Sequence, residues 1–191
     1  QGESLSATDV GELPNVGNPE ELSTDSNEVP LRVEGGEIPQ DQQTGVYSKA
    51  DGSGETLVVR TPRVSDLEIN NGNGQDVAGG TLLTSDSAEV KAVFNYADAE
   101  NITVSVEDAS GVDVTEEWFT LTSVDASNLT QAAGGSGVDF PATAEGTVDW
   151  QIEQSRLESV GTGTYTITVE GATSLDFGEA TRSATVTIVE E

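Results

Sequence analysis

The feature that most restricts the fold of this chain is a strict alternation of apolar and polar side chains. In the segment YTITVE, the residues Tyr165, Ile167 and Val169 occupy every second position. The segment ATVTIVE, residues 184–190, repeats this pattern with Thr residues on the opposite face. A period of two is that of a half-buried β-strand, whereas a helix needs a period near 3.6. Both segments are therefore predicted strands whose apolar faces require a second layer.

Further segments after Arg63 have the same character, and turn residues separate them. The seven predicted strands are 64–69, 88–96, 101–107, 117–123, 147–153, 164–170 and 181–189. Short strands in such a series indicate an all-β fold, specifically an immunoglobulin-like β-sandwich. One or two helical turns are predicted within residues 153–160.

A smaller β domain is predicted before this sandwich. A candidate strand at 45–48, a turn at 51–54 and a β-branched run at 56–60 together predict a hairpin. Pro62 cannot donate a hydrogen bond within a central strand, and it marks a boundary. We expect a small N-terminal β domain over residues 1–62, whose start lies upstream of this chain, and the sandwich over 63–191.

The stretch SVGTGTYTITVEG predicts a tyrosine corner at Tyr165, in which the phenol bonds to backbone upstream of its strand. The alternative is an ordinary strand tyrosine. The chain has no Cys, so the disulfide found in many immunoglobulin domains is absent. Trp118 and Trp150 are the residues expected to fill that space.

The charge of the chain restricts the salt concentration and the partners that suit it. It carries 35 Asp and Glu against 7 Lys and Arg, for a formal net charge of −28. Such a chain repels itself in dilute buffer, and at roughly molar salt a Debye length of about 3 Å removes most of that repulsion. Acid excess beside only two Lys residues is typical of a halophile's protein. The same charge argues against nucleic acid as a partner and favours divalent cations.

Composition also argues against enzymatic activity. Without Cys or His, the chain lacks a thiol nucleophile, thiolate metal ligands and the commonest general base. An acid-pair glycosidase stays open as an alternative, because it needs only two carboxylates about 5 to 9.5 Å apart in a cleft. No cofactor is expected apart from structural calcium.

Two kinds of candidate site remain. The triplets NIT at Asn101 and NLT at Asn128 are N-glycosylation sequons. Carboxylates with small residues between them offer oxygen ligands for calcium, and the two candidate pairs are Asp51 with Glu55 and Asp108 with Asp113. The alternative for Asp108 and Asp113 is a solvated turn, residues 107–113, joining strands 101–107 and 117–123 in a hairpin.

Three stretches carry a resemblance to a known family. Residues 93–108, residues 106–117 and the closing GTYTITVEGATSLDFGEATRSATVTI, residues 163–188, resemble the N-terminal part of haloarchaeal S-layer glycoproteins. Residues 45–69 resemble the junction between the family's first two β domains. The resemblance is more specific in the second domain than in residues 12–37.

The resemblance implies an extracellular, N-glycosylated protein at the cell surface, in which copies self-associate into a two-dimensional S-layer lattice with the help of divalent cations. It also implies membrane attachment only through a C-terminal anchor absent from this chain. A structural cell-surface protein is therefore the predicted function. The alternative is a surface adhesin or lectin-like binding module on the same scaffold.

Overall fold

The computed structural model describes residues 22–24, 29–32, 38–39, 41–49, 57–59, 61, 63–95, 101–120, 123–125, 146–171 and 180–191. These residues fall into two compact units, which divide between Pro62 and Arg63.

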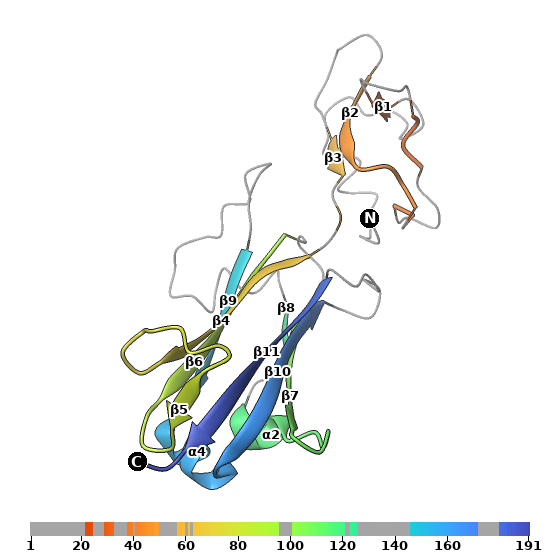
Figure 1. The fold of residues 1–191 in the computed structure, drawn as a ribbon. Helices are drawn as coiled ribbons and strands as arrows, with labels where there is room; N and C mark the ends of the chain where they lie inside the picture. The colour runs from red at the N-terminus through yellow and green to blue at the C-terminus, as the bar shows by residue number, and fades with distance from the viewer. Residues whose placement is uncertain are drawn as a thin grey trace. The chain divides into compact units, whose positions relative to one another are not determined.

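The second unit consists of two β-sheets (Figure 1). The three-stranded sheet has the order β4–β6–β9, with bounds Val64–Asn71, Ala88–Phe94 and Gly146–Ile152. The five-stranded sheet has the order β5–β11–β10–β7–β8, with bounds Thr81–Leu83, Thr181–Val189, Gly163–Gly171, Asn101–Asp108 and Ser123–Asp125. All pairs are antiparallel except β11 with β5, which run parallel. The prediction of an all-β fold is confirmed.

The strand order follows the immunoglobulin pattern. Strands β4, β6 and β9 occupy the places of A, B and E in one sheet, and β7, β10 and β11 occupy those of C, F and G in the other. The short strand β8 pairs beside β7, in the place of C′. Alternation along the strands is the reason for this layering, because each strand presents one apolar face to the opposite sheet.

The core of the sandwich contains the apolar residues that the alternation predicts. Ile167 and Val169 of β10 and Val186 and Ile188 of β11 are at most 1% exposed. The opposite sheet contributes residues that are equally buried: Ile69, Val90, Ala92, Phe94 and Ile152. Aligned sheets of this kind enclose a core about 10 Å thick.

One predicted strand, residues 117–123, is wrong. Residues Thr115–Trp118 form the short helix α2, and the next strand, β8, begins only at Ser123. Arg156 explains part of the difference, because its guanidinium donates to the Glu116 carbonyl at 2.7 Å and the Glu117 carbonyl at 3.3 Å. Carbonyls at the end of a helix lack partners within it, and a cation there is favourable. Arg156 comes from helix α4, Gln154–Val160, which matches the predicted helical turns.

The edge of β4 that faces away from β6 is covered by hydrogen bonds from nearby residues. The Ile69 carbonyl accepts from the Val77 amide at 2.7 Å, and the Ile69 amide donates to Asp76 Oδ1 at 3.2 Å. Nearer the start of the strand, Arg182 of β11 donates to the Ser65 carbonyl. Unpaired strand edges are templates for pairing with other chains, so these contacts protect β4 from it.

The first unit contains a three-stranded sheet in the order β1–β2–β3, with bounds Leu22–Thr24, Gly45–Lys49 and Leu57–Val59. β2 and β3 pair antiparallel, as the predicted hairpin requires. Buried Gln42 connects this sheet to the preceding loop, since its Nε2 donates to the Pro30 carbonyl at 3.1 Å and to the Tyr47 phenol at 2.5 Å. The Tyr47 hydroxyl donates in turn to the Gln43 carbonyl at 2.6 Å.

Candidate functional site

The acidic turn that follows β7 is organised around the carboxylate of Asp108. Its Oδ1 accepts hydrogen bonds from the Ser110 amide at 2.8 Å, the Ser110 hydroxyl at 2.7 Å and the Val112 amide at 3.0 Å. Gly111 has a φ of +80°, a conformation that other residues rarely adopt, and its amide donates to the Asp108 carbonyl. The exposed side chain of Val112 lies at the tip.

Asp113 fixes the far side of this turn to the core. Its Oδ1 accepts from the Thr115 amide at 2.8 Å and from the Thr115 hydroxyl at 2.5 Å. The same hydroxyl accepts from the amide of buried Val106 at 2.8 Å. An antiparallel β-bridge between the backbones of Glu107 and Asp113 closes the turn. The predicted turn is therefore present, but the chain enters α2 after it, and β8 pairs with the other end of β7.

Both carboxylates are stabilised in the ionised form. The Ser110 hydroxyl, followed by the backbone amides, lowers the pKa of Asp108 below its ordinary value of 3.8. The Thr115 hydroxyl, followed by its amide, lowers the pKa of Asp113 in the same way. Hydrogen bonds to a charged carboxylate have this effect. One oxygen of each carboxylate, Oδ1, thus has a structural role in holding the turn.

The other predicted site residues are only partly described. Asn101 is the first residue of β7. Asp51, Glu55 and Asn128 lie outside the described residues. Within the part of the chain that the structure describes, no group of three or more acidic side chains is placed to hold a metal ion. Calcium binding and glycosylation therefore remain predictions.

The predicted tyrosine corner is confirmed at Tyr165. Its hydroxyl donates to the Val160 carbonyl at 3.1 Å and lies 3.3 Å from the Gly161 carbonyl. The ring meets Trp118 edge-on at 5.1 Å between centroids. Burial, followed by the charges of Asp108 and Glu117, raises the pKa of this phenol. Trp118 thus packs beside the corner, although sequence reasoning placed it in a strand.

A hollow of about 600 Å³ lies beside the acidic turn. Among the described residues, its acidic lining consists of Asp113, Glu116, Glu117 and Glu170, and residues 103–105 and 114–115 also line it. None of the described residues that line it is aromatic. Sugar-cleaving sites place aromatic groups beside their carboxylate pair for substrate binding, so this hollow gives no support to the glycosidase alternative.

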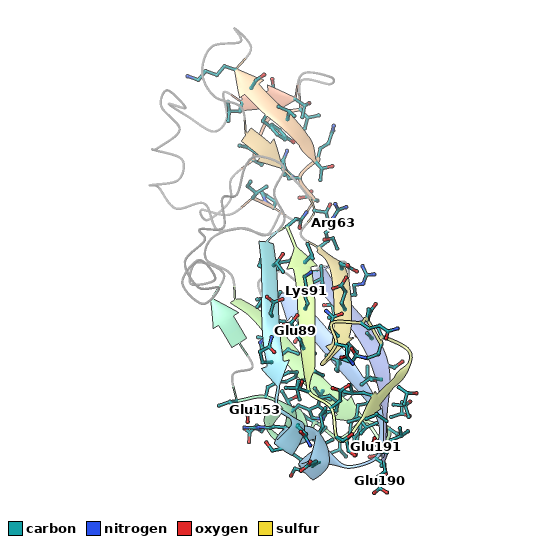
Figure 2. All side chains as sticks on the ribbon, turned by 90° about the vertical axis from the view of Figure 1, so that its left-hand side faces the viewer. Arg63, Glu89, Lys91, Glu153, Glu190 and Glu191 are labelled. Carbon is teal, nitrogen blue, oxygen red and sulfur yellow. The ribbon has the colours of Figure 1, made fainter. Side chains whose placement is uncertain are left out.

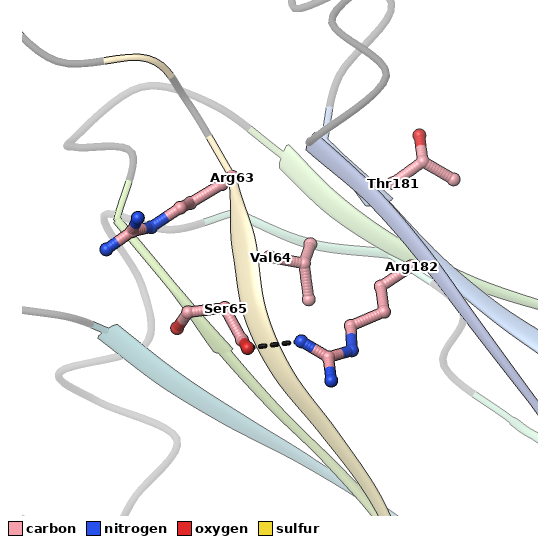
Figure 3. A pocket seen from close by; sticks show the side chains of 5 residues that line it. All are labelled: Arg63, Val64, Ser65, Thr181 and Arg182. Atoms are coloured by element: carbon pink, nitrogen blue, oxygen red, sulfur yellow. Dashed lines mark hydrogen bonds between the residues drawn. The ribbon is translucent and has the colours of Figure 1, made fainter.

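A second hollow, of about 570 Å³, is lined by two of the few basic residues of the chain (Figure 3). Arg63 and Arg182 both line it, and the dashed line in the figure marks the bond from Arg182 to the Ser65 carbonyl. Arg182 also lies 3.8 Å from Asp66 Oδ1. Its guanidinium therefore connects β11 to β4 across the two sheets.

The outer face of the β4–β6–β9 sheet is acidic. Figure 2 looks onto this sheet and labels Glu89 and Lys91 on β6. Lys91 lies 3.6 Å from Glu68 and is paired in register with Asp149. Partial burial, followed by the charge of Glu89, raises the pKa of Asp149. One Lys is thus surrounded by several carboxylates on this face.

Curated relatives of this chain are surface proteins of halophilic archaea. A cell surface glycoprotein of Haloarcula marismortui is 37% identical over 194 residues, covering 97% of this chain and 20% of the relative. That of Haloarcula japonica is 36% identical over 93% of this chain, and that of Halobacterium salinarum is 37% identical over 84%. The chain is a homologue of haloarchaeal cell surface glycoproteins. The predicted resemblance is thereby confirmed.

The chain spans about a fifth of the length of the haloarchaeal cell surface glycoproteins that it matches. No family model matches it. Among solved structures, the C-terminal domain of wzt is similar at a TM-score of 0.41 and 14% identity, over 69% of this chain and 75% of that domain. The described residues include no helix long and apolar enough to cross a membrane. The relatives' names agree with the predicted location at the cell surface.

Proposed function

We propose that this chain is part of a structural protein of the cell envelope, whose copies assemble into an S-layer lattice around a halophilic archaeon. The observation that carries the proposal is its similarity to cell surface glycoproteins over 97% of its length. A sandwich with a covered β4 edge suits a structural role, because it offers other chains few unpaired backbone groups there.

Divalent cations and glycans are part of this proposal. Two copies of a chain with a net charge of −28 repel each other, and calcium bound between carboxylates would lower that repulsion. Asp51, Glu55, Asp108 and Asp113 are the proposed contributors. The Oδ2 atoms of Asp108 and Asp113, which accept no hydrogen bond from the described residues, are the oxygens available to such a cation. Glycans at Asn101 and Asn128 would hydrate the outer surface.

Electron microscopy of the full-length protein at molar salt tests the proposal. The protein is imaged with calcium, after chelation, and after calcium is restored. Ordered sheets that dissolve on chelation and re-form with calcium are the expected result. Sheets that persist after chelation would remove the cations from the proposal but keep the lattice. Dispersed monomers under all three conditions would overturn the lattice and favour an adhesin or accessory surface protein.

A further inference from the structure

The outer face of β10, the central strand of the five-stranded sheet, and of its neighbour β11 is lined by hydroxyl groups. Strand alternation turns every second side chain of β10 and β11 outward, opposite the buried Tyr165, Ile167 and Val169. We call this surface the hydroxyl face, and it consists of Thr164, Thr166, Thr168, Thr181, Ser183, Thr185 and Thr187. β7 extends it with Thr103 and Ser105, while Glu107 and Glu170 are its charged members.

The hydroxyl face is held in a fixed arrangement. Thr164 and Thr187 are 3.2 Å apart between hydroxyl oxygens, and Thr168 and Ser183 are 2.8 Å apart. Thr166 lies directly opposite Thr185 in the register of β10 and β11. Because β-branched side chains are already restricted at χ1, ordering them in a contact costs little further entropy.

The two outer faces of the sandwich differ in the position of their charges, which lie around the middle strand of one sheet and beside or at one end of the β10–β11 pair in the other. The β4–β6–β9 face carries Glu68, Glu89 and Asp149 around one Lys, and partial burial, followed by the charge of Glu89, raises the pKa of Asp149. A second copy approaching that face would add further carboxylates. On the hydroxyl face, the positions from Thr164 to Thr168 and from Ser183 to Thr187 carry no charge.

Hydroxyl groups also suit a contact between identical surfaces. Each one donates one hydrogen bond and accepts others, whereas ionised carboxylates only accept and cannot bond to each other. A two-fold contact brings the same surface of both copies together, so it needs groups that can play both roles. We propose that the hydroxyl face is a contact surface between two copies of this chain. This inference rests on the proposed self-assembly.

The size of the hydroxyl face suits a weak, repeated contact. Three strands spaced about 4.8 Å apart, each of eight residues, cover roughly 400 Å². That is about half of what one partner buries in a standard stable complex. Such a contact is weak alone, but a lattice repeats it many times. Since it involves few charges, molar salt leaves it largely intact.

Matched substitutions in the full-length protein test this proposal. Thr185→Glu places a carboxylate on the hydroxyl face, opposite Thr166, and Thr147→Glu makes the same change on the exposed outer side of β9. The readout is the protein concentration at which sheets form at molar salt, followed by sedimentation, with thermal unfolding of each variant as the folding check. Thr185→Glu is expected to raise this concentration about tenfold, while Thr147→Glu changes it less than about twofold.

Equal effects of the two variants would show general repulsion between copies and overturn the proposed contact surface, as would normal assembly of Thr185→Glu. Thr166→Val, which removes the hydroxyl but keeps the strand-favouring shape, provides a second variant without added charge. It is expected to raise the assembly concentration by a smaller factor, and wild-type behaviour would contradict the role of the hydroxyl group. If the wild-type protein itself never assembles, the proposed lattice fails and this inference falls with it.

Discussion

Thr115 is the residue that connects the acidic turn to the core of the sandwich. Its hydroxyl accepts from the amide of buried Val106 and donates to Asp113. Thr115→Val keeps the shape but leaves that amide without its acceptor, so we predict a loss of about 1–3 kcal/mol in the free energy of unfolding. Urea unfolding at molar salt measures it, with the exposed Thr147→Val as control. Equal stability of the two variants would contradict this role.

The turn also predicts a measurable pH dependence at Asp108. The pKa of Asp108 is lower in the folded protein than its ordinary value of 3.8. The ionised carboxylate therefore stabilises the fold at pH values above 3.8, and this stabilisation is lost as the pH falls through the folded pKa. Ser110→Ala removes the largest cause, and the folded pKa of Asp108 is expected to rise. NMR titration of the carboxylate in molar salt measures the shift. An unchanged pKa would mean that the backbone amides alone set it.

At the scale of elements, the alternation of apolar and polar residues predicted the long strands correctly. It failed where contacts with residues distant in the sequence determine the structure. Strands β10 and β11 show their period of two directly, and the tyrosine corner follows from residues close to Tyr165. Residues 117–118 are helical instead, with Arg156 bound to the end of α2 from about 40 residues away. β5 has three residues and pairs with β11 about 100 residues later. Neither contact leaves a local pattern in the sequence.

The closed edge of β4 gives a prediction at the same scale. Asp76 Oδ1 accepts from the Ile69 amide at 3.2 Å and from the Ala78 amide at 2.9 Å, which holds the returning loop against the strand. Asp76→Ala is expected to free this edge, lower stability by about 1 kcal/mol and produce irregular aggregates. Sedimentation velocity at molar salt detects them. As a control, Asp86→Ala removes an equal charge from another turn, and this variant should stay dispersed. Aggregation of both variants would contradict the role of Asp76 in covering the edge of β4.

For the whole molecule, the acidic surface and the apolar core act in opposite directions. The core of both units is built from ordinary aliphatic and aromatic side chains, which favour the compact state at any salt concentration. The net charge of −28 favours expansion unless ions screen it. Stability is therefore set by the balance between burial, which the fold determines, and repulsion, which the surroundings determine.

This balance predicts the form of the salt dependence. The Debye length falls from about 10 Å at 0.1 M to about 3 Å at 1 M, so screening is nearly complete at the higher concentration. The free energy of unfolding should rise steeply up to about 1 M sodium chloride and then flatten. Urea unfolding at a series of salt concentrations measures it. A rise that continues linearly to 4 M would instead indicate exclusion of salt from the protein surface, which strengthens burial without saturating. A flat response throughout would show that carboxylate repulsion does not limit this fold.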